Sequence, residues 1–194
     1  MTSMTFRTLT IAAAAGLGLA CTPAAMNPPL PSAAPAAPGA SAAVPAAAPS
    51  AAANPVPANL VAYHGATQGH LALPPAGGPA KAPAVVIIHE WWGLNDHIRG
   101  QANELAKSGY VVLAVDLYNG KVAANQAEAQ AQTKAVGENP TEATANLQDA
   151  VKFLRARADV AKVGSLGWCF GGGWSLKLVQ AQKDLAAGVV YYGA

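Results

Sequence analysis

The chain has 194 residues, of which 52% are hydrophobic and 11% charged, with a formal net charge of +2. This length allows one domain, and the small net charge, without a basic stripe, argues against nucleic-acid binding. The charges are unevenly distributed, because no Asp, Glu, Lys or Arg occurs between Arg7 and Lys81. The sequence therefore divides into two unlike parts.

The N-terminus resembles an export signal. A positively charged start precedes an apolar run over 9–20, which is shorter than the about 20 residues of a membrane-spanning helix. The run ends at Ala20-Cys21, and a small residue before a cysteine resembles a bacterial lipobox, although Gly18 stands where leucine is usual. We expect a lipoprotein signal over 1–21, lipidation of Cys21 and a position at the periplasmic face of the cell envelope. Ordinary cleaved export and an unprocessed N-terminus are the alternatives.

Residues 22–58 consist mostly of alanine and proline and have no periodic apolar face. Such a segment cannot bury enough apolar surface to offset the entropy of ordering, and its prolines favour an extended spacer. We expect a disordered linker between an anchor and a folded domain. If Cys21 is lipidated or removed, Cys169 is the remaining thiol, and it cannot form an intramolecular disulfide.

From residue 59 onward, strand and helix signals alternate. Short β-branched or alternating apolar runs predict strands at 59–64, 69–74, 82–90, 110–118, 160–167 and 186–194. Longer segments with helical spacing or helix-forming composition predict helices at 93–110, 121–136, 139–157 and 170–182. This order predicts an α/β fold with a mostly parallel sheet and helices on both faces.

Two of these helices begin with capping signals. Asn95 or Asp96 is a suitable N-cap for the first helix. In the third helix we expect Asn139 as N-cap, Pro140 at the first helical position and Glu142 completing a capping box.

The segment GWCFGG (167–172) connects a predicted strand to a predicted helix. Strand, G-x-C-x-G and helix form the arrangement of a nucleophile elbow, whose tight turn exposes the nucleophile. The positive end of the helix favours a thiolate at Cys169, and the Phe170 N–H points to where an oxyanion would form. A glycine-rich turn with a buried structural cysteine is the alternative. A Rossmann loop is disfavoured because no G-x-G-x-x-G occurs here, and a P-loop is excluded because the segment lacks G-K-[ST].

The segment HEWWGLNDHIR (89–99) follows a buried strand. Ligands of open α/β sheets bind outside the carboxyl ends of the strands, so Glu90 should lie at the same edge as Cys169. A carboxylate beside two tryptophans should be partly shielded from water and could act as a base or hydrogen-bond partner toward the thiol. An ordinary exposed glutamate is the alternative, and Trp91 and Trp92 are either pocket wall or a lid over the core.

Residues 59–194 closely resemble the dienelactone hydrolase family of α/β-hydrolases in four segments, in this order: VVIIHEWWG, GYVVLAVDLYNGKVA, VGSLGWCFGGGWSL and AAGVVYYGA. The resemblance implies an α/β-hydrolase-type sheet and hydrolysis of a small-molecule lactone or carboxylic ester through an acyl-cysteine, with no cofactor. It implies Cys169 as nucleophile and Glu90 as the partner that controls the protonation of the thiol. It also implies an oxyanion hole from the N–H groups of Phe170 and Trp91.

We expect the substrate pocket to include Trp92, Tyr118 and Lys121. The founding members of the family place an arginine shortly after D-L-Y, where it helps to hold a substrate carboxylate. In this chain Gly120 stands there, next to Lys121. The departure argues against a dicarboxylate-type substrate.

The acid and the histidine of an α/β-hydrolase triad follow the nucleophile in the chain. After Cys169 this sequence contains no histidine, and its acidic residue is Asp184. We expect structural roles, and no metal site, for the histidines that precede the elbow: His64, His70, His89 and His97. We therefore expect that the 194 residues lack the C-terminal strands of the fold and that this form is an impaired hydrolase. It should either aggregate or be acylated without turnover.

Two functions from different classes are open. The first is a cysteine-nucleophile hydrolase of which these residues are an incomplete part. The second is a non-catalytic α/β scaffold at the cell envelope, or the product of a pseudogene. An open reading frame after codon 194 that encodes an Asp and then a His favours the enzyme, whereas a stop codon favours the second.

Replacing Cys21 with alanine tests the predicted lipid attachment. We expect the wild-type protein in the membrane fraction. The Cys21→Ala protein should be released or retain its leader, because the lipid is attached to that sulfur. Fractionation and intact-mass measurement report both results. Recovery of only cytoplasmic protein with an intact Met1 would contradict the prediction.

Overall fold

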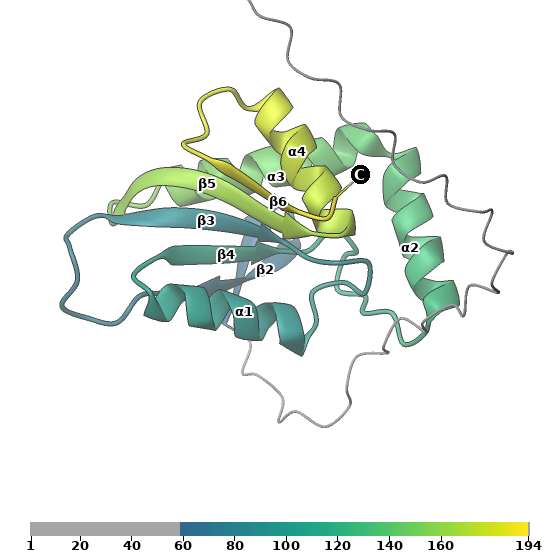
Figure 1. Ribbon diagram of the computed structural model, residues 1–194, viewed down its shortest axis with the longest axis horizontal. Coiled ribbons are helices and arrows are strands. Elements are labelled where there is room, and N and C mark those ends of the chain that lie inside the picture. Colours follow the sequence, from purple (N-terminus) through teal and green to yellow (C-terminus); the bar gives the residue numbers. More distant parts are fainter. Residues whose placement is uncertain (1–58, 194) are drawn as a thin grey trace, which may run out of the picture. The chain divides into compact units, whose positions relative to one another are not determined.

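The computed structural model describes residues 59–193, so the predicted signal (1–21) and linker (22–58) lie outside the described residues. These residues form one six-stranded sheet with flanking helices (Figure 1). The strands are β1 (Leu60–His64), β2 (Thr67–Ala72), β3 (Ala82–Ile88), β4 (Val111–Val115), β5 (Val160–Trp168) and β6 (Gly188–Tyr191). The helices are α1 (Asp96–Lys107), α2 (Gln126–Glu138), α3 (Pro140–Arg155) and α4 (Phe170–Ala181).

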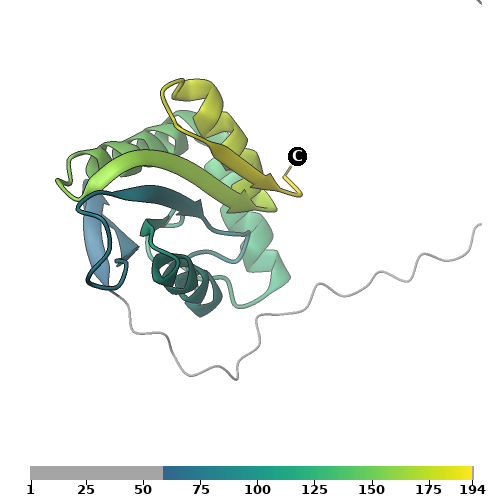
Figure 2. The ribbon, with the colours of Figure 1, turned by 60° about the vertical axis from the view of Figure 1, so that its left-hand side comes forward.

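The strand order is β1-β2-β4-β3-β5-β6. Strands β3 to β6 run parallel, and the β1–β2 hairpin joins β4 in antiparallel pairing. Helix α1 covers one face of the sheet, while α3 and α4 cover the other (Figures 1 and 2). The predicted mostly parallel sheet with helices on both faces is therefore confirmed.

The central strand β3 is apolar on both faces. Its side chains alternate, so Val86 and Ile88 pack with α3 and α4, while Ile87 packs with α1; all three are fully buried. The edge strand β6 differs, because each of its residues is exposed. Within residues 59–193, no helix is long and apolar enough to cross a membrane.

The predicted capping box of α3 is wrong. Pro140 does open the helix, but the Asn139 side chain donates to the Ala135 carbonyl of α2 at 3.0 Å and makes no cap hydrogen bond to α3. The Glu142 carboxylate instead pairs with His64, with Glu142 Oε1 2.9 Å from His64 Nε2. Asn139 follows the end of α2 and precedes α3, so its amide is used by the helix behind it.

Helix α2 begins five residues later than the sequence pattern predicts. The Asn125 side chain accepts from the Glu128 N–H at 3.0 Å and caps the helix there. The residues before it are held in a loop, where the Ala123 N–H donates to the Trp92 carbonyl at 2.9 Å. In α1 the predicted cap is confirmed for Asn95, which accepts from the Ile98 N–H at 3.1 Å.

A buried polar network holds the loop after β4. The Tyr63 hydroxyl donates to Asn146 Oδ1 at 2.7 Å and accepts the Asp116 N–H at 3.1 Å. Burial raises the pKa of Tyr63, so the phenol stays neutral. The Asp116 carboxylate in turn accepts the N–H groups of Tyr118, at 2.7 Å, and Gly120. Hydrogen bonds at both the N–H and the carboxylate of Asp116 thereby hold the start of the loop.

His64 connects the hairpin to α3 through two carboxylates. Its Nε2 lies 2.9 Å from Glu142 Oε1 and its Nδ1 lies 2.8 Å from Asp149 Oδ2. The hydrogen bonds to Glu142 and Asp149 stabilise the imidazolium and raise the pKa of His64 above its ordinary value.

Replacing His64 with glutamine should make stability depend less on pH. Because the folded pKa exceeds the unfolded one, His64 stabilises the fold fully below about pH 6.5, and the contribution disappears as pH rises through the folded pKa. We expect His64→Gln to lower the free energy of unfolding by up to about 1 kcal/mol at pH 5.5 and by less at pH 9. Urea denaturation at both pH values measures this. His97→Gln, at an exposed position of α1, is the control, and an equal loss at both pH values would contradict the assignment.

Candidate active site

Cys169 occupies the turn between β5 and α4. Its backbone has φ +53° and ψ −122°, a left-handed conformation that is strained for any residue except glycine. The Cys169 N–H donates to the Tyr191 carbonyl of β6 at 3.0 Å, and the Cys169 carbonyl accepts from Gly173 at 3.2 Å. The turn therefore holds a half-buried thiol just beyond the carboxyl end of the sheet. The predicted strand–turn–helix geometry is present.

Two glycines allow this turn. A Cβ atom on Gly171 would overlap the carbonyl oxygens of Ile88 and His89 at the end of β3. A Cβ atom on Gly167 would overlap the carbonyl oxygen of Gly171. The first turn of α4 thus lies directly against the ends of β3 and β5, with no room for any side chain between them.

The two amides proposed for an oxyanion hole come from these adjoining segments. Phe170 is the first residue of α4, where backbone N–H groups lack helical partners. Trp91 lies just past the end of β3. In the part of the chain that the structure describes, neither amide donates to another group. Both are therefore available to a ligand, and the positive end of α4 would stabilise negative charge there.

His89 fixes the peptide that carries the Trp91 amide. The Leu117 N–H donates to His89 Nε2 at 3.1 Å, so Nδ1 carries the hydrogen and donates it to the Glu90 carbonyl at 2.6 Å. Complete burial lowers the pKa of His89 and keeps this neutral form. A trans peptide is planar, so holding the Glu90 carbonyl directs the Trp91 N–H to the opposite side. Neither ring nitrogen is free to transfer a proton.

Glu90 is half-buried and is held by a tyrosine that sequence reasoning missed. The Tyr192 hydroxyl donates to Glu90 Oε1 at 3.1 Å, from a backbone with φ +39°. Partial shielding from water, the bond to Glu90 and the nearby charges of Glu90 and Cys169 raise the pKa of Tyr192. Tyr192 thus contacts Glu90 directly and follows Tyr191, whose carbonyl accepts the Cys169 N–H. Among residues 59–193, no hydrogen bond joins the Glu90 carboxylate to the thiol.

Two of the three predicted pocket residues are buried. Trp92 packs edge-on against Trp91, with ring centroids 5.1 Å apart, and against Ala129 of α2. The Tyr118 hydroxyl donates to the Trp91 carbonyl at 3.1 Å and lies 3.2 Å from Thr133 Oγ1. Burial raises the pKa of Tyr118 to about 12. Their contact with a substrate stays a prediction, because both side chains support the loop rather than an open surface.

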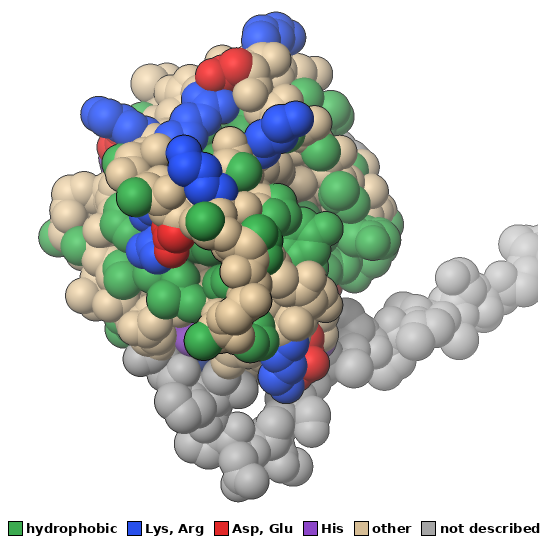
Figure 3. Space-filling model, turned by 90° about the vertical axis from the view of Figure 1, so that its left-hand side faces the viewer, with side chains coloured by type: hydrophobic (Ala, Val, Ile, Leu, Met, Phe, Trp, Pro, Cys, Tyr) green, Lys and Arg blue, Asp and Glu red, His purple; other side chains and the backbone are tan. Residues whose placement is uncertain are grey.

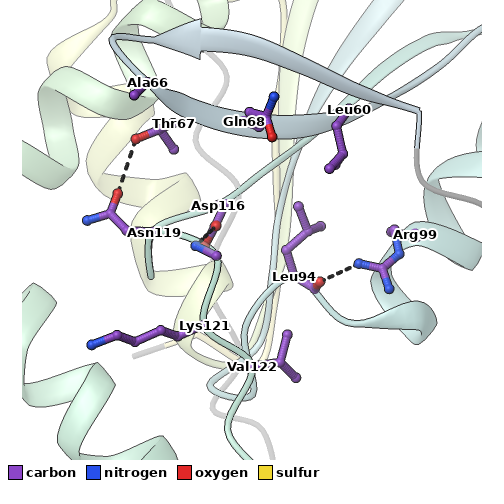
Figure 4. A pocket seen from close by; sticks show the side chains of 11 residues that line it. Leu60, Ala66, Thr67, Gln68, Leu94, Arg99, Asp116, Asn119, Lys121 and Val122 are labelled. Atoms are coloured by element: carbon purple, nitrogen blue, oxygen red, sulfur yellow. Dashed lines mark hydrogen bonds between the residues drawn. The ribbon is translucent and has the colours of Figure 1, made fainter.

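Lys121 is exposed and lines two hollows beside the loop after β4. One hollow, of about 470 Å³, lies between this loop, the β1–β2 hairpin and the start of α1 (Figure 4). In it Thr67 donates to Asn119 Oδ1 at 3.1 Å, opposite the apolar Leu60 and Leu94. The other hollow, of about 330 Å³, lies against α2 and α3. Neither is lined by Cys169 or Glu90.

The other histidines lie on elements away from the thiol. His70 is buried on β2, accepts from the Asn59 N–H at 3.1 Å and lies 2.8 Å from Asn103 Oδ1. His64 is paired with α3, and His97 is exposed on α1. Within 59–193, no group of three or more His, Cys, Asp or Glu side chains is arranged to hold a metal ion.

The strand order, the strained turn after β5 and the carboxylate at the end of the neighbouring strand define an α/β-hydrolase-type fold. Residues 67–194 match the dienelactone hydrolase family. The chain belongs to this family.

Known sequences and a solved structure match similar shares of this chain. Protein usf of Aquifex pyrophilus is 35% identical over 133 residues, covering 65% of this chain and 56% of that protein. The carboxymethylenebutenolidase of Pseudomonas putida is 29% identical over 145 residues, covering 70% and 59%. The crystal structure of a dienelactone hydrolase-like promiscuous phosphotriesterase from metagenomic libraries is 30% identical with a TM-score of 0.63, covering 72% and 60%. The chain spans about half the length of the curated relatives it matches.

A pair of glycine-to-alanine substitutions tests the close approach of α4. Gly171→Ala should lower the free energy of unfolding by about 2 kcal/mol or more, because the new methyl group meets backbone that cannot move cheaply. Gly100→Ala, within α1, meets open space and should stabilise the protein by about 0.5–1 kcal/mol. Denaturation midpoints measure both changes. Equal effects of the two substitutions would show that α4 does not lie against the strand ends.

Proposed function

We propose that this protein cleaves a carboxylic ester or lactone through the thiol of Cys169 and an acyl-cysteine intermediate. The supporting observation is the strained turn that presents Cys169 at the start of α4, against the strand end that leads to Glu90. A thiolate is a strong nucleophile without further activation, and the amides of Phe170 and Trp91 donate no hydrogen bond within residues 59–193. The relative from Pseudomonas putida is named carboxymethylenebutenolidase, and because a butenolide is a lactone, its name supports the same class of substrate.

In the acylation step, Glu90 accepts the proton of the thiol while the sulfur attacks the carbonyl carbon of the substrate. The C–S bond forms and the carbonyl electrons move to oxygen, where the N–H groups of Phe170 and Trp91 stabilise the negative charge. Collapse of this adduct breaks the bond to the leaving oxygen, which takes up the proton. The products are the acyl-cysteine and an alcohol, or a hydroxyl group on the same molecule if the substrate is a lactone.

Deacylation needs a water molecule and a base to activate it, and such help is typically worth about 10²- to 10⁴-fold. No histidine follows Cys169 in the 194 residues, and His89 has both nitrogens engaged. We therefore propose that the 194-residue chain is acylated faster than it turns over.

Alkylation of the thiol tests these roles without requiring turnover. Iodoacetamide should label Cys169 in the folded protein, and Cys169→Ala should abolish the labelling. Glu90→Gln should slow labelling near pH 7, where the carboxylate serves as proton acceptor. It should leave the rate nearly unchanged at pH 9.5, where hydroxide in solution removes the thiol proton without help from Glu90. Mass spectrometry of timed reactions gives the pH profile.

Glu104→Gln is the matched control, because Glu104 is exposed on α1 and paired with Lys107; its profile should equal that of the wild type. A thiol that reacts only after denaturation would instead favour a non-catalytic scaffold. An activated aryl ester should produce one equivalent of alcohol per chain. Steady turnover that is lost in Cys169→Ala would show that the base lies within these residues.

A further inference from the structure

Most of the cations of the domain lie where the parallel strands begin, at the end of the sheet opposite Cys169, which we call the basic edge. This basic edge comprises the amino ends of β3, β5 and β6 and the carboxyl ends of α1, α3 and α4. Its seven cationic residues are Lys81, Lys107, Lys152, Arg155, Arg157, Lys162 and Lys183. Figure 3 looks onto this side of the molecule and shows Lys and Arg side chains gathered there.

The charges of the domain are segregated. Seven cations and three carboxylates at the basic edge give +4, whereas four cations and seven carboxylates on the rest of residues 59–193 give −3. The small net charge of the chain conceals this difference. A separation of this size creates a directional field that orients the domain near a charged surface.

The carboxylates of the basic edge are already occupied. Glu104 pairs with Lys107 at 2.7 Å, Asp184 with Arg155 at 2.7 Å and Asp159 with Arg157 at 2.7 Å. The remaining lysines are exposed, and their side chains make no ion pair or hydrogen bond within residues 59–193: Lys81, Lys152, Lys162 and Lys183. They are available to an external anion.

Helix dipoles account for only part of this arrangement. Cations are favoured in the last turn of a helix, which explains Lys107, Lys152 and Arg155. Lys162 lies within β5, and Lys81 directly precedes β3. These positions have no helix to stabilise, so the gathering of charge needs another cause.

An apolar loop accompanies the lysines. The segment 73–79 begins with Leu73, which is 49% exposed, and continues through three prolines and two glycines. It borders a hollow of about 490 Å³ whose other walls, Ala82, Val111 and Asp159, are at the starts of β3, β4 and β5. Exposed apolar groups among cations suit the interface of an anionic bilayer, where the lysines meet headgroups and the apolar side chains enter beneath them.

We propose that the basic edge docks on an anionic phospholipid surface, with Leu73 and its loop entering the headgroup region. Parallel strands point away from this edge, so the docked domain presents Cys169 and Glu90 to the solution. The surface charge of the domain is sufficient for docking, and the proposal depends neither on lipidation of Cys21 nor on catalysis. If Cys21 is lipidated, the anchor would hold the domain near the membrane and make even weak docking effective.

Vesicle binding with two matched charge reversals tests this. The whole chain carrying Cys21→Ser is mixed with vesicles of phosphatidylcholine, or of phosphatidylcholine and phosphatidylglycerol at 7:3, and the bound fraction is measured by flotation. We expect at least about tenfold stronger binding to the anionic vesicles at 50 mM NaCl, lost at 300 mM NaCl. Neutral vesicles measure binding through the apolar N-terminal run.

The first variant combines Lys152→Glu, Lys162→Glu and Lys183→Glu; the second combines Lys121→Glu, Lys134→Glu and Lys177→Glu, away from the basic edge. Both have the same net charge. The first should lose about tenfold or more in binding to anionic vesicles, and a Lys→Gln version should lose less, while the second should bind within about twofold of the parent. Equal losses in both, equal binding to the two vesicle types, or binding to a DNA duplex but not to vesicles would overturn the proposal.

Discussion

The close approach of α4 to the ends of β3 and β5 is the constraint on which the rest of the site depends. Gly167 and Gly171 leave no space between helix and strands, so the chain has to turn within one residue. That residue, Cys169, takes a left-handed backbone conformation. The Cys169 N–H also donates to the Tyr191 carbonyl of β6, so the position of β6 depends on the turn that precedes α4.

Buried polar groups then transmit this rigidity to the neighbouring loops. His89 hydrogen-bonds to the backbone of two segments: one ring nitrogen accepts from the Leu117 N–H and the other donates to the Glu90 carbonyl. Tyr63 and Asn146 hold Asp116 in a similar way. The polar side-chain atoms of His89, Tyr63 and Asn146 are all hydrogen-bonded within the fold. Their effect is to give the surrounding peptides fixed orientations, which an enzyme of this fold needs before any charge develops.

The sequence was sufficient for features that arise from local chemistry. Strand β3 was predictable because a short β-branched run has few alternatives, and the elbow because Gly167 and Gly171 flank Cys169 closely in sequence. The capping box of α3 failed because Glu142 has a partner 78 residues away, which no local pattern reports. The contact of Tyr192 with Glu90 spans 102 residues. The lysines of the basic edge are likewise distant in sequence, and only parallel strand pairing gathers them.

The connectivity of the sheet has a consequence for how its chemistry can change. From β3 the chain moves through α1, on one face, to β4; from β4 it crosses by α3, on the other face, to β5 on the far side of β3. The segment after β3 leads to α1 on one face, and the segment after β5 leads to α4 on the other. The two segments therefore diverge at the carboxyl ends of neighbouring strands. The divergence at this topological switch point is a property of the backbone path and not of the side chains beside it. Because this path does not depend on Glu90 or Cys169, substitution of either residue leaves the same diverging strand ends in place to carry other side chains.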